Sequence, residues 1–136
     1  MAKTSTFDMR VRGQLIMLTA AFLLGMGVNL TGLPSEVSGT AKTATSIFLG
    51  LHAFIALGLL IGAALTVRQA RQFGTDYIQK AWIAATLVVL TIISGVLTIG
   101  LDSNWWSYAM AVGFIASFVI YGRLYLQVFI SHHNSK

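Results

Sequence analysis

The hydrophobic positions fall into four long stretches, at about residues 13–33, 44–67, 81–101 and 105–130. Each stretch reaches the roughly 20 residues that an α-helix needs to cross the hydrocarbon core of a bilayer. A transmembrane strand would be much shorter and would alternate apolar with polar positions, a pattern that these stretches lack. A helix also pairs its own backbone groups, as lipid requires. The pattern therefore predicts four transmembrane helices.

The polar segments between these stretches predict where the helices begin and end. The first segment, residues 34–43, contains the one proline of the chain, and we expect Thr43 or Thr45 to cap the second helix. In the second segment, residues 68–77, we expect Gly74 to end a helix and Thr75 or Asp76 to begin the next. The third segment, residues 102–104, is so short that the last two helices are expected to form an antiparallel hairpin.

Composition agrees with a lipid environment. The chain is 56% hydrophobic and 10% charged, whereas a soluble domain carries about 25% charged residues. The first stretch has the length of a membrane span rather than of the shorter apolar core of a signal peptide, so we expect it to be a retained helix. The fold class predicted for residues 1–136 is all-α, a single integral-membrane domain built as an antiparallel four-helix bundle. The chain has no cysteine, which excludes disulfides, thiolate metal sites and cysteine nucleophiles.

The basic residues predict how the chain is oriented. Its net charge is +5, and eight of the nine Lys and Arg residues belong to one predicted side, which contains both termini and the middle loop; Lys42 alone belongs to the other. The eight are Lys3, Arg10, Arg12, Arg68, Arg71, Lys80, Arg123 and Lys136. Cytoplasmic loops are the ones enriched in Lys and Arg, so we expect both termini to be cytoplasmic, in the plasma (inner) membrane of a prokaryote. This placement fits an anionic membrane surface and does not predict a nucleic-acid partner.

Small and polar residues gather on one side of each predicted helix when positions are placed at 100° per residue. Because such residues mark the contacts between membrane helices, we expect one compact bundle. The groups are Gln14, Ala21, Gly25, Asn29 and Gly32; His52, Ala56, Gly58, Gly62, Ala63 and Thr66; Ala84, Thr91, Ser94, Gly95 and Thr98; and Ala109, Gly113, Ala116 and Ser117. The spacing of Gly58 and Gly62 indicates either packing inside this bundle or a contact between two copies of the chain.

His52 is the ionisable residue that lies well inside a predicted span, and such residues are costly and often functional. Asn29, Ser94, Thr98 and Tyr108 are expected at a similar depth. Together with His52 they predict a polar pocket that opens outward. One interpretation is structural, with Asn29 and either Ser94 or Thr98 satisfying the imidazole. The others are a site for haem, quinone or another small ligand, and a proton relay.

The segment from His52 to Gly58, a histidine followed by small residues, is generally similar to spans of four-helix b-type cytochromes. Those families usually supply paired histidines from facing helices, whereas His132 and His133 here follow the last predicted span. Met26 or Met110 is the candidate for a second axial ligand of b-type haem. The general shape, four helices with a short last hairpin, also resembles the DoxX-type small membrane proteins. Neither resemblance includes a distinctive motif, so the cofactor stays unknown, with haem b as one candidate.

Three functions follow, in order of preference. The first is a non-enzymatic accessory or scaffolding subunit of a membrane complex, because the polar segments are short and no Ser-His-Asp set, zinc motif or phosphate loop is present. Its expected partners are the bilayer and either other membrane proteins or further copies of the chain. The second is a protein that binds b-type haem, quinone or a small ligand at the pocket around His52. The third is a transporter of a small neutral solute.

Overall fold

Four long helices make up nearly all of the described chain in the computed structural model, which describes residues 2–101 and 104–133. They are α1 (Ala2–Thr31), α2 (Gly39–Ala70), α3 (Thr75–Leu101) and α4 (Asn104–His133). Each is long and apolar enough to cross a membrane. The prediction of an all-α fold with four membrane-length helices is thus confirmed, and the protein is a small multi-pass membrane protein.

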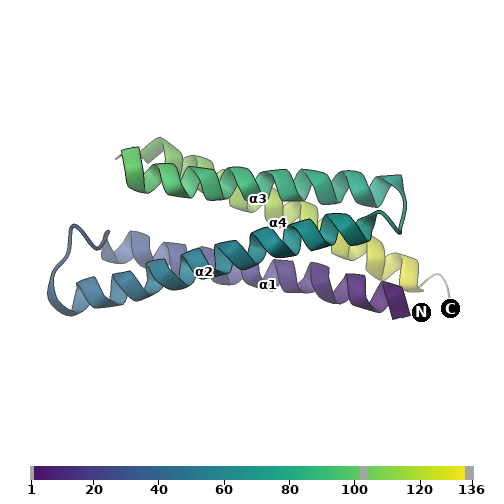
Figure 1. Cartoon of the computed structure of the whole chain (residues 1–136), viewed down its shortest axis with the longest axis horizontal. Coiled ribbons are helices and arrows are strands. Elements are labelled where there is room, and N and C mark those ends of the chain that lie inside the picture. Colours follow the sequence, from purple (N-terminus) through teal and green to yellow (C-terminus); the bar gives the residue numbers. More distant parts are fainter. Residues whose placement is uncertain (1, 102–103, 134–136) are drawn as a thin grey trace.

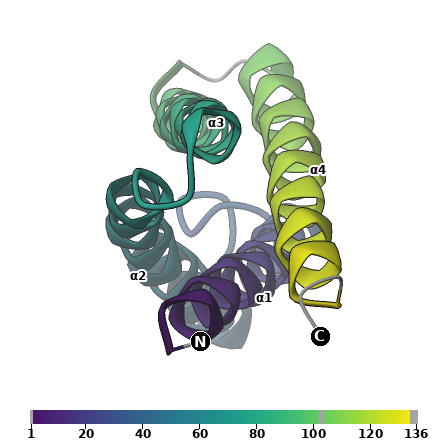
Figure 2. The ribbon, with the colours of Figure 1, turned by 90° about the vertical axis from the view of Figure 1, so that its right-hand side faces the viewer.

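The helices are arranged as two pairs. α1 packs mainly on α2 and α3 mainly on α4, and the pairs meet where α2 contacts α3 and where α1 contacts α4. Figure 1 shows the start of α1 and the end of α4 at the same end of the molecule, and Figure 2 shows that end from the front. We call this the basic end, because Arg68 and Arg71 near the end of α2 and Arg10 and Arg12 near the start of α1 lie there.

The first helix begins well before residue 13, where the apolar stretch starts. The side chains of Phe7 and Val11 explain this difference, because both are fully buried. The Phe7 ring stacks on Phe73 with centroids 4.8 Å apart, and it meets Tyr77 edge-on at 6.2 Å. This aromatic cluster holds the first turns of α1 against the connection between α2 and α3, so tertiary packing extends the helix beyond its apolar run.

The turn between α2 and α3 agrees with the prediction only in part, because α2 ends at Ala70, before the Gly74 that was expected to end it. Gly74 has a φ of +114°, a value that favours glycine, and α3 begins at Thr75. The cap predicted for the second helix is wrong: α2 begins at Gly39, and Ser38 holds the capping position without a side-chain hydrogen bond. Thr45 is instead buried, and its hydroxyl donates to the Thr31 hydroxyl at 2.6 Å. Asp102 and Ser103, in the last connection, lie outside the described residues.

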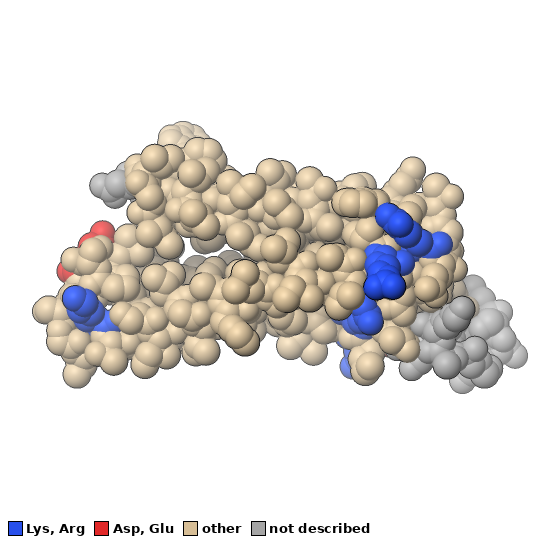
Figure 3. Space-filling view, in the orientation of Figure 1, with Lys and Arg blue, Asp and Glu red and all other residues tan. Residues whose placement is uncertain are grey.

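The buried core lies toward the basic end. Its apolar members are Phe7, Val11, Leu18 and Ala21 of α1, Leu59, Ala63, Val67 and Ala70 of α2, Ala81, Ala84 and Val88 of α3, and Tyr121, Leu124 and Val128 of α4. Toward the other end, large side chains such as Leu30, Val96 and Ile99 are exposed. Figure 3 shows a hollow between the layer of α3 and the layer of α1 and α2 at that end. On this face the two layers are therefore separated at the end opposite the basic end, whereas Phe22 of α1 still stacks on Phe114 of α4 with ring centroids 4.7 Å apart.

Glycines set the closest approaches between helices. A Cβ added at Gly58 or Gly62 would meet Met17 or Gln14 of α1, and one added at Gly113 would meet Thr91 of α3. These contacts show that the glycines of the predicted small-residue sides of α2 and α4 face neighbouring helices, whereas Asn29 and Ala109, of the sides predicted on α1 and α4, are exposed. The glycine contacts also favour packing inside the bundle as the role of Gly58 and Gly62, since both glycines face α1.

Candidate functional site

His52 joins α2 to α1 by a hydrogen bond. Its Nδ1 lies 2.7 Å from the carbonyl oxygen of Ala21, one turn before Gly25 on α1. A Cβ added at Gly25 would lie 3.2 Å from the Cε1 atom of His52, so the missing side chain of this glycine leaves room for the ring. The imidazole thus has a polar partner across the helix interface, inside an apolar segment.

This hydrogen bond also fixes where the imidazole carries its proton. A carbonyl oxygen only accepts hydrogen bonds, so Nδ1 must be the donor. In the neutral ring, Nε2 then has a free lone pair. An imidazole that donates from one nitrogen to a carbonyl and offers the other to a metal is the usual arrangement of a histidine ligand. The contact therefore serves the structural interpretation of His52 and also leaves Nε2 able to bind a ligand.

The other residues of the predicted pocket have differing environments. Asn29 is exposed near the end of α1, and Tyr108 is 66% exposed, with its ring edge-on to Trp105. Ser94 is buried, and its carbonyl accepts a hydrogen bond from the Thr98 hydroxyl within α3. Among the described residues, no hydrogen bond joins His52 to any of these four side chains. The pocket around His52 stays a prediction.

The two candidate methionine ligands lie on different helices. Met26 is 42% exposed on α1. Met110 is half-buried, with its sulfur next to Gly95 of α3. The environment of Met110 is that of a side chain filling the α3–α4 contact, as methionine commonly does. Its part in haem binding, like that of Met26, stays a prediction.

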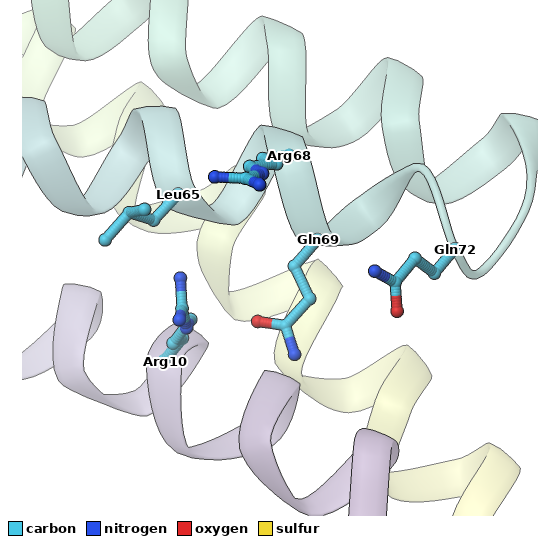
Figure 4. Close-up of a pocket in the computed structure, with 5 residues that line it drawn as sticks. All are labelled: Arg10, Leu65, Arg68, Gln69 and Gln72. Carbon is cyan, nitrogen blue, oxygen red and sulfur yellow. The ribbon is translucent and has the colours of Figure 1, made fainter.

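A groove at the basic end was not predicted. It lies between α1 and α2 and is lined by Arg10, Leu65, Arg68, Gln69 and Gln72. Figure 4 shows Arg10 extending from α1 toward α2 and Gln69 extending from α2 toward α1. Arg10 and Arg68 both contribute to the charge asymmetry that predicts the orientation of the chain. The sequence alone does not place them on facing surfaces, because that depends on the register of the two helices.

A second polar group at the basic end joins α3 to α4. Lys80 donates to Asp76 at 2.6 Å and to the Gln127 side-chain oxygen at 2.7 Å, and the Gln127 amide donates to Asp76 at 2.5 Å. The three side chains satisfy one another across the two helices. Figure 3 shows other Lys and Arg side chains gathered on this end.

One face of α2 differs from the rest of the exposed surface. Ser46, Gly50 and Ala53 are exposed and follow one another at helical spacing. A Cβ added at Gly50 would meet no other atom within 4 Å. Most other exposed positions on the helices carry large apolar side chains such as Phe54, Leu57 and Ile61. This small face leaves the α2 backbone open to close approach.

Comparison with known proteins assigns no family: no family model, no curated protein and no solved structure matches the chain. The function proposed below is therefore argued from the residues and their geometry.

Proposed function

We propose that this membrane protein is a non-enzymatic accessory or scaffolding subunit that binds the helices of a larger membrane complex. The exposed face of Ser46, Gly50 and Ala53 on α2 carries the proposal. In a bilayer, bulky apolar side chains gain nothing by leaving lipid for another helix, whereas small residues let two backbones approach and make close van der Waals contact. The small face is therefore the part of the exposed surface best suited to a partner helix.

The hydrogen bonds of the buried polar residues support the same proposal. His52 binds a carbonyl of α1, Thr45 binds Thr31, and the hydroxyl of Ser117 donates to a carbonyl of its own helix at 2.7 Å. The first two hydrogen bonds join α2 to α1, and the third stays within α4. A chain that uses these polar groups for its own packing and leaves a helix face open has the properties of a subunit that positions other helices.

Site-specific photo-crosslinking tests this proposal. A photoreactive amino acid at Ala53, in the protein's own membranes, should give one discrete adduct with another polypeptide. The same amino acid at Val112, an exposed position on α4, is the control and should react mainly with lipid. Gly50→Leu should abolish the Ala53 adduct, because the larger side chain prevents close approach. Adducts with lipid alone, or only with a second copy of this chain, would contradict the proposal.

A second candidate function is the binding of b-type haem or another small ligand at His52. The observation that favours it is the Nδ1–H bond to Ala21, which leaves Nε2 free to coordinate. Titration of the purified protein with haemin should then give a Soret band shifted from that of free haemin, at one haem per chain. His52→Ala should lose the shifted band, whereas Met17→Leu, at another α1–α2 contact, should keep it. An unshifted spectrum would exclude haem as the ligand of His52.

A further inference from the structure

The groove between α1 and α2 at the basic end brings two guanidinium groups to one hollow. Arg10 of α1 and Arg68 of α2 both line it, and its volume is about 240 Å³. Figure 4 shows the guanidinium of Arg10 pointing toward α2, where Leu65 and Arg68 lie. Arginine stays protonated in proteins, so two permanent positive charges share this hollow.

No carboxylate is among the residues that line the groove. Of the acids near the basic end, Asp76 pairs with Lys80 and Gln127 on the other helix pair. Asp8 of α1 is not in the lining, and among the described residues no salt bridge joins it to either arginine. The repulsion between Arg10 and Arg68 is thus not offset by the lining itself, and an anion between them would offset it.

Two amides add hydrogen-bonding groups to the same hollow. Gln69 and Gln72 line the groove, and the Gln69 Oε1 atom is buried without a hydrogen-bond partner among the described residues. Turning this amide by half a rotation exchanges its oxygen for an NH₂ group, with almost no change of shape. Two guanidinium forks and two amide donors suit an anion with several oxygens, and guanidinium matches phosphate in particular.

The groove also has an apolar edge. Leu65 is exposed and lies on the side toward the apolar part of α2, while Gln72 lies beyond the last residue of the helix, Ala70. The lining from 65 to 72 therefore covers roughly 10 Å along the helix axis. Along this stretch the lining changes from apolar at Leu65 to charged and polar at Arg68 and Gln72. A lipid changes in the same way from its acyl chains to its headgroup. Basic pockets between transmembrane helices are known sites for anionic headgroups.

We propose that the groove of Arg10, Arg68, Gln69 and Gln72 binds a phosphate group. The phosphate would accept hydrogen bonds from both guanidinium groups and from the amides. The same chemistry would hold the headgroup of an anionic phospholipid, with its acyl chains along Leu65, or a soluble phosphate. The site is separate from the α2 face of Ser46, Gly50 and Ala53, so it stands or falls independently of the proposed function.

The test compares two double variants of equal charge. Arg10→Gln with Arg68→Gln removes both guanidinium groups of the groove, and Arg12→Gln with Arg71→Gln removes two exposed arginines nearby on the sequence that do not line it. The purified, delipidated protein in an uncharged detergent is titrated with phosphatidic acid, and lipid adducts are counted by native mass spectrometry. We expect the first variant to bind at least about tenfold more weakly, because charge-assisted bonds are lost. We expect the second to stay within about twofold of the unmodified chain, since its phosphate contacts are intact.

A second arm identifies the source of the phosphate. Inorganic phosphate at millimolar concentration is added to the lipid titration. If it fails to displace phosphatidic acid, the site recognises a lipid headgroup; if it displaces the lipid, the site takes phosphate from either source. Equal losses in the two double variants would show that only the overall charge matters and would overturn the proposal, as would unchanged binding by the groove variant. Should the groove variant not fold, Arg10→Lys with Arg68→Lys, which keeps the charge and loses the planar fork, must bind more weakly than Arg12→Lys with Arg71→Lys.

Discussion

At the scale of single residues, His52 illustrates how a polar side chain is accommodated between two apolar helices. Its Nδ1–H donates to the Ala21 carbonyl, which is also the oxygen that the backbone of α1 presents to Gly25 one turn later. The carbonyl therefore keeps an intrahelical partner when the imidazole is removed. The hydrogen bond from His52 therefore helps to pair α1 with α2, and the Ala21 carbonyl does not depend on it for a partner.

We predict that His52→Phe lowers the free energy of unfolding by about 1 kcal/mol, the size of a typical hydrogen bond between membrane helices. The phenyl ring is somewhat larger than imidazole, so it leaves no cavity, and it cannot donate a hydrogen bond to the carbonyl. Reversible unfolding in mixed micelles with increasing denaturing detergent measures it. A variant as stable as the unmodified chain would contradict the role assigned to this contact.

We predict that Gly25→Ala has opposite effects on the free energy of unfolding with and without the His52 ring. In the unmodified chain, Gly25→Ala should destabilise, because the new Cβ would lie 3.2 Å from the His52 ring. In a His52→Ala background the same substitution meets no ring, and it should stabilise by up to about 1 kcal/mol through the higher helix propensity of alanine. The same unfolding assay gives both values. Equal effects in the two backgrounds would show that Gly25 and His52 are not coupled.

Sequence reasoning found His52 but not its partner, and the reason is physical. Its structural interpretation paired the imidazole with the side chains of Asn29 and either Ser94 or Thr98, because side chains are the polar groups that a sequence displays. Every residue has a carbonyl, so the oxygen of Ala21 carries no mark in the sequence. The one indication is Gly25, whose small size allows the ring to approach α1.

At the scale of elements, the helix pairs are defined by which small residue faces which neighbour. On α1 and α2, Thr31 meets Thr45, Gly25 meets His52, and Gly62 meets Gln14, so contacts farther along one helix fall earlier on the other. The small-residue sides were predictable from their helical spacing. The register of the two helices was not predictable, because it depends on where α2 begins. The helix ends are fixed by the aromatic cluster and by the buried Thr45, and both are tertiary contacts that the sequence pattern does not show.

We predict that Gly113→Ala loosens the pair of α3 and α4 and lowers stability by about 2 kcal/mol, as overpacking does in a tight core. The new Cβ would overlap the Thr91 hydroxyl. That hydroxyl donates to the Leu87 carbonyl at 2.7 Å, and the β-branched side chain has few other rotamers. The unfolding assay in mixed micelles measures the change.

Two controls make this prediction specific. Gly122 lies on the same helix, and a Cβ added there meets nothing within 4 Å, so Gly122→Ala should be neutral or slightly stabilising. Thr91→Ala removes the overlapping group, so Gly113→Ala should cost much less in that background. If Gly113→Ala and Gly122→Ala behave alike, the close approach of α3 and α4 does not contribute to stability.

At the scale of the whole molecule, the division between a packed basic end and a separated opposite end was beyond sequence reasoning. Small residues on all four helices predicted one compact bundle, yet beyond the middle of the bundle few of the described positions are buried, such as Thr45 and Ser94 (8% exposed). The buried core that the four helices share includes Phe7 and Tyr121 near the basic end, and farther along the bundle the Phe22 ring of α1 stacks on Phe114 of α4. Hydrophobic periodicity describes single helices, so it does not predict the difference in burial between the two ends of the bundle.

The distribution of charge over the molecule leads to the last prediction, on orientation. Arg10, Arg12, Arg68 and Arg71 lie near the basic end, whereas Lys42 and Glu36 lie in or near the connection between α1 and α2, at the opposite end. Figure 3 shows Lys and Arg side chains gathered at the basic end and few at the other. Each Lys or Arg held on the cytoplasmic side avoids the cost of translocation, so this asymmetry should place the basic end in the cytoplasm.

The chain has no cysteine, so single cysteines can report the two sides without background. In intact prokaryotic cells, a membrane-impermeant maleimide should label Ser35→Cys in the connection between α1 and α2. It should label Thr75→Cys at the start of α3 only after the cells are permeabilised, and the reverse pattern would place the basic end outside. Labelling of both positions in intact cells would mean that the population inserts in two orientations, which an asymmetry this large should prevent.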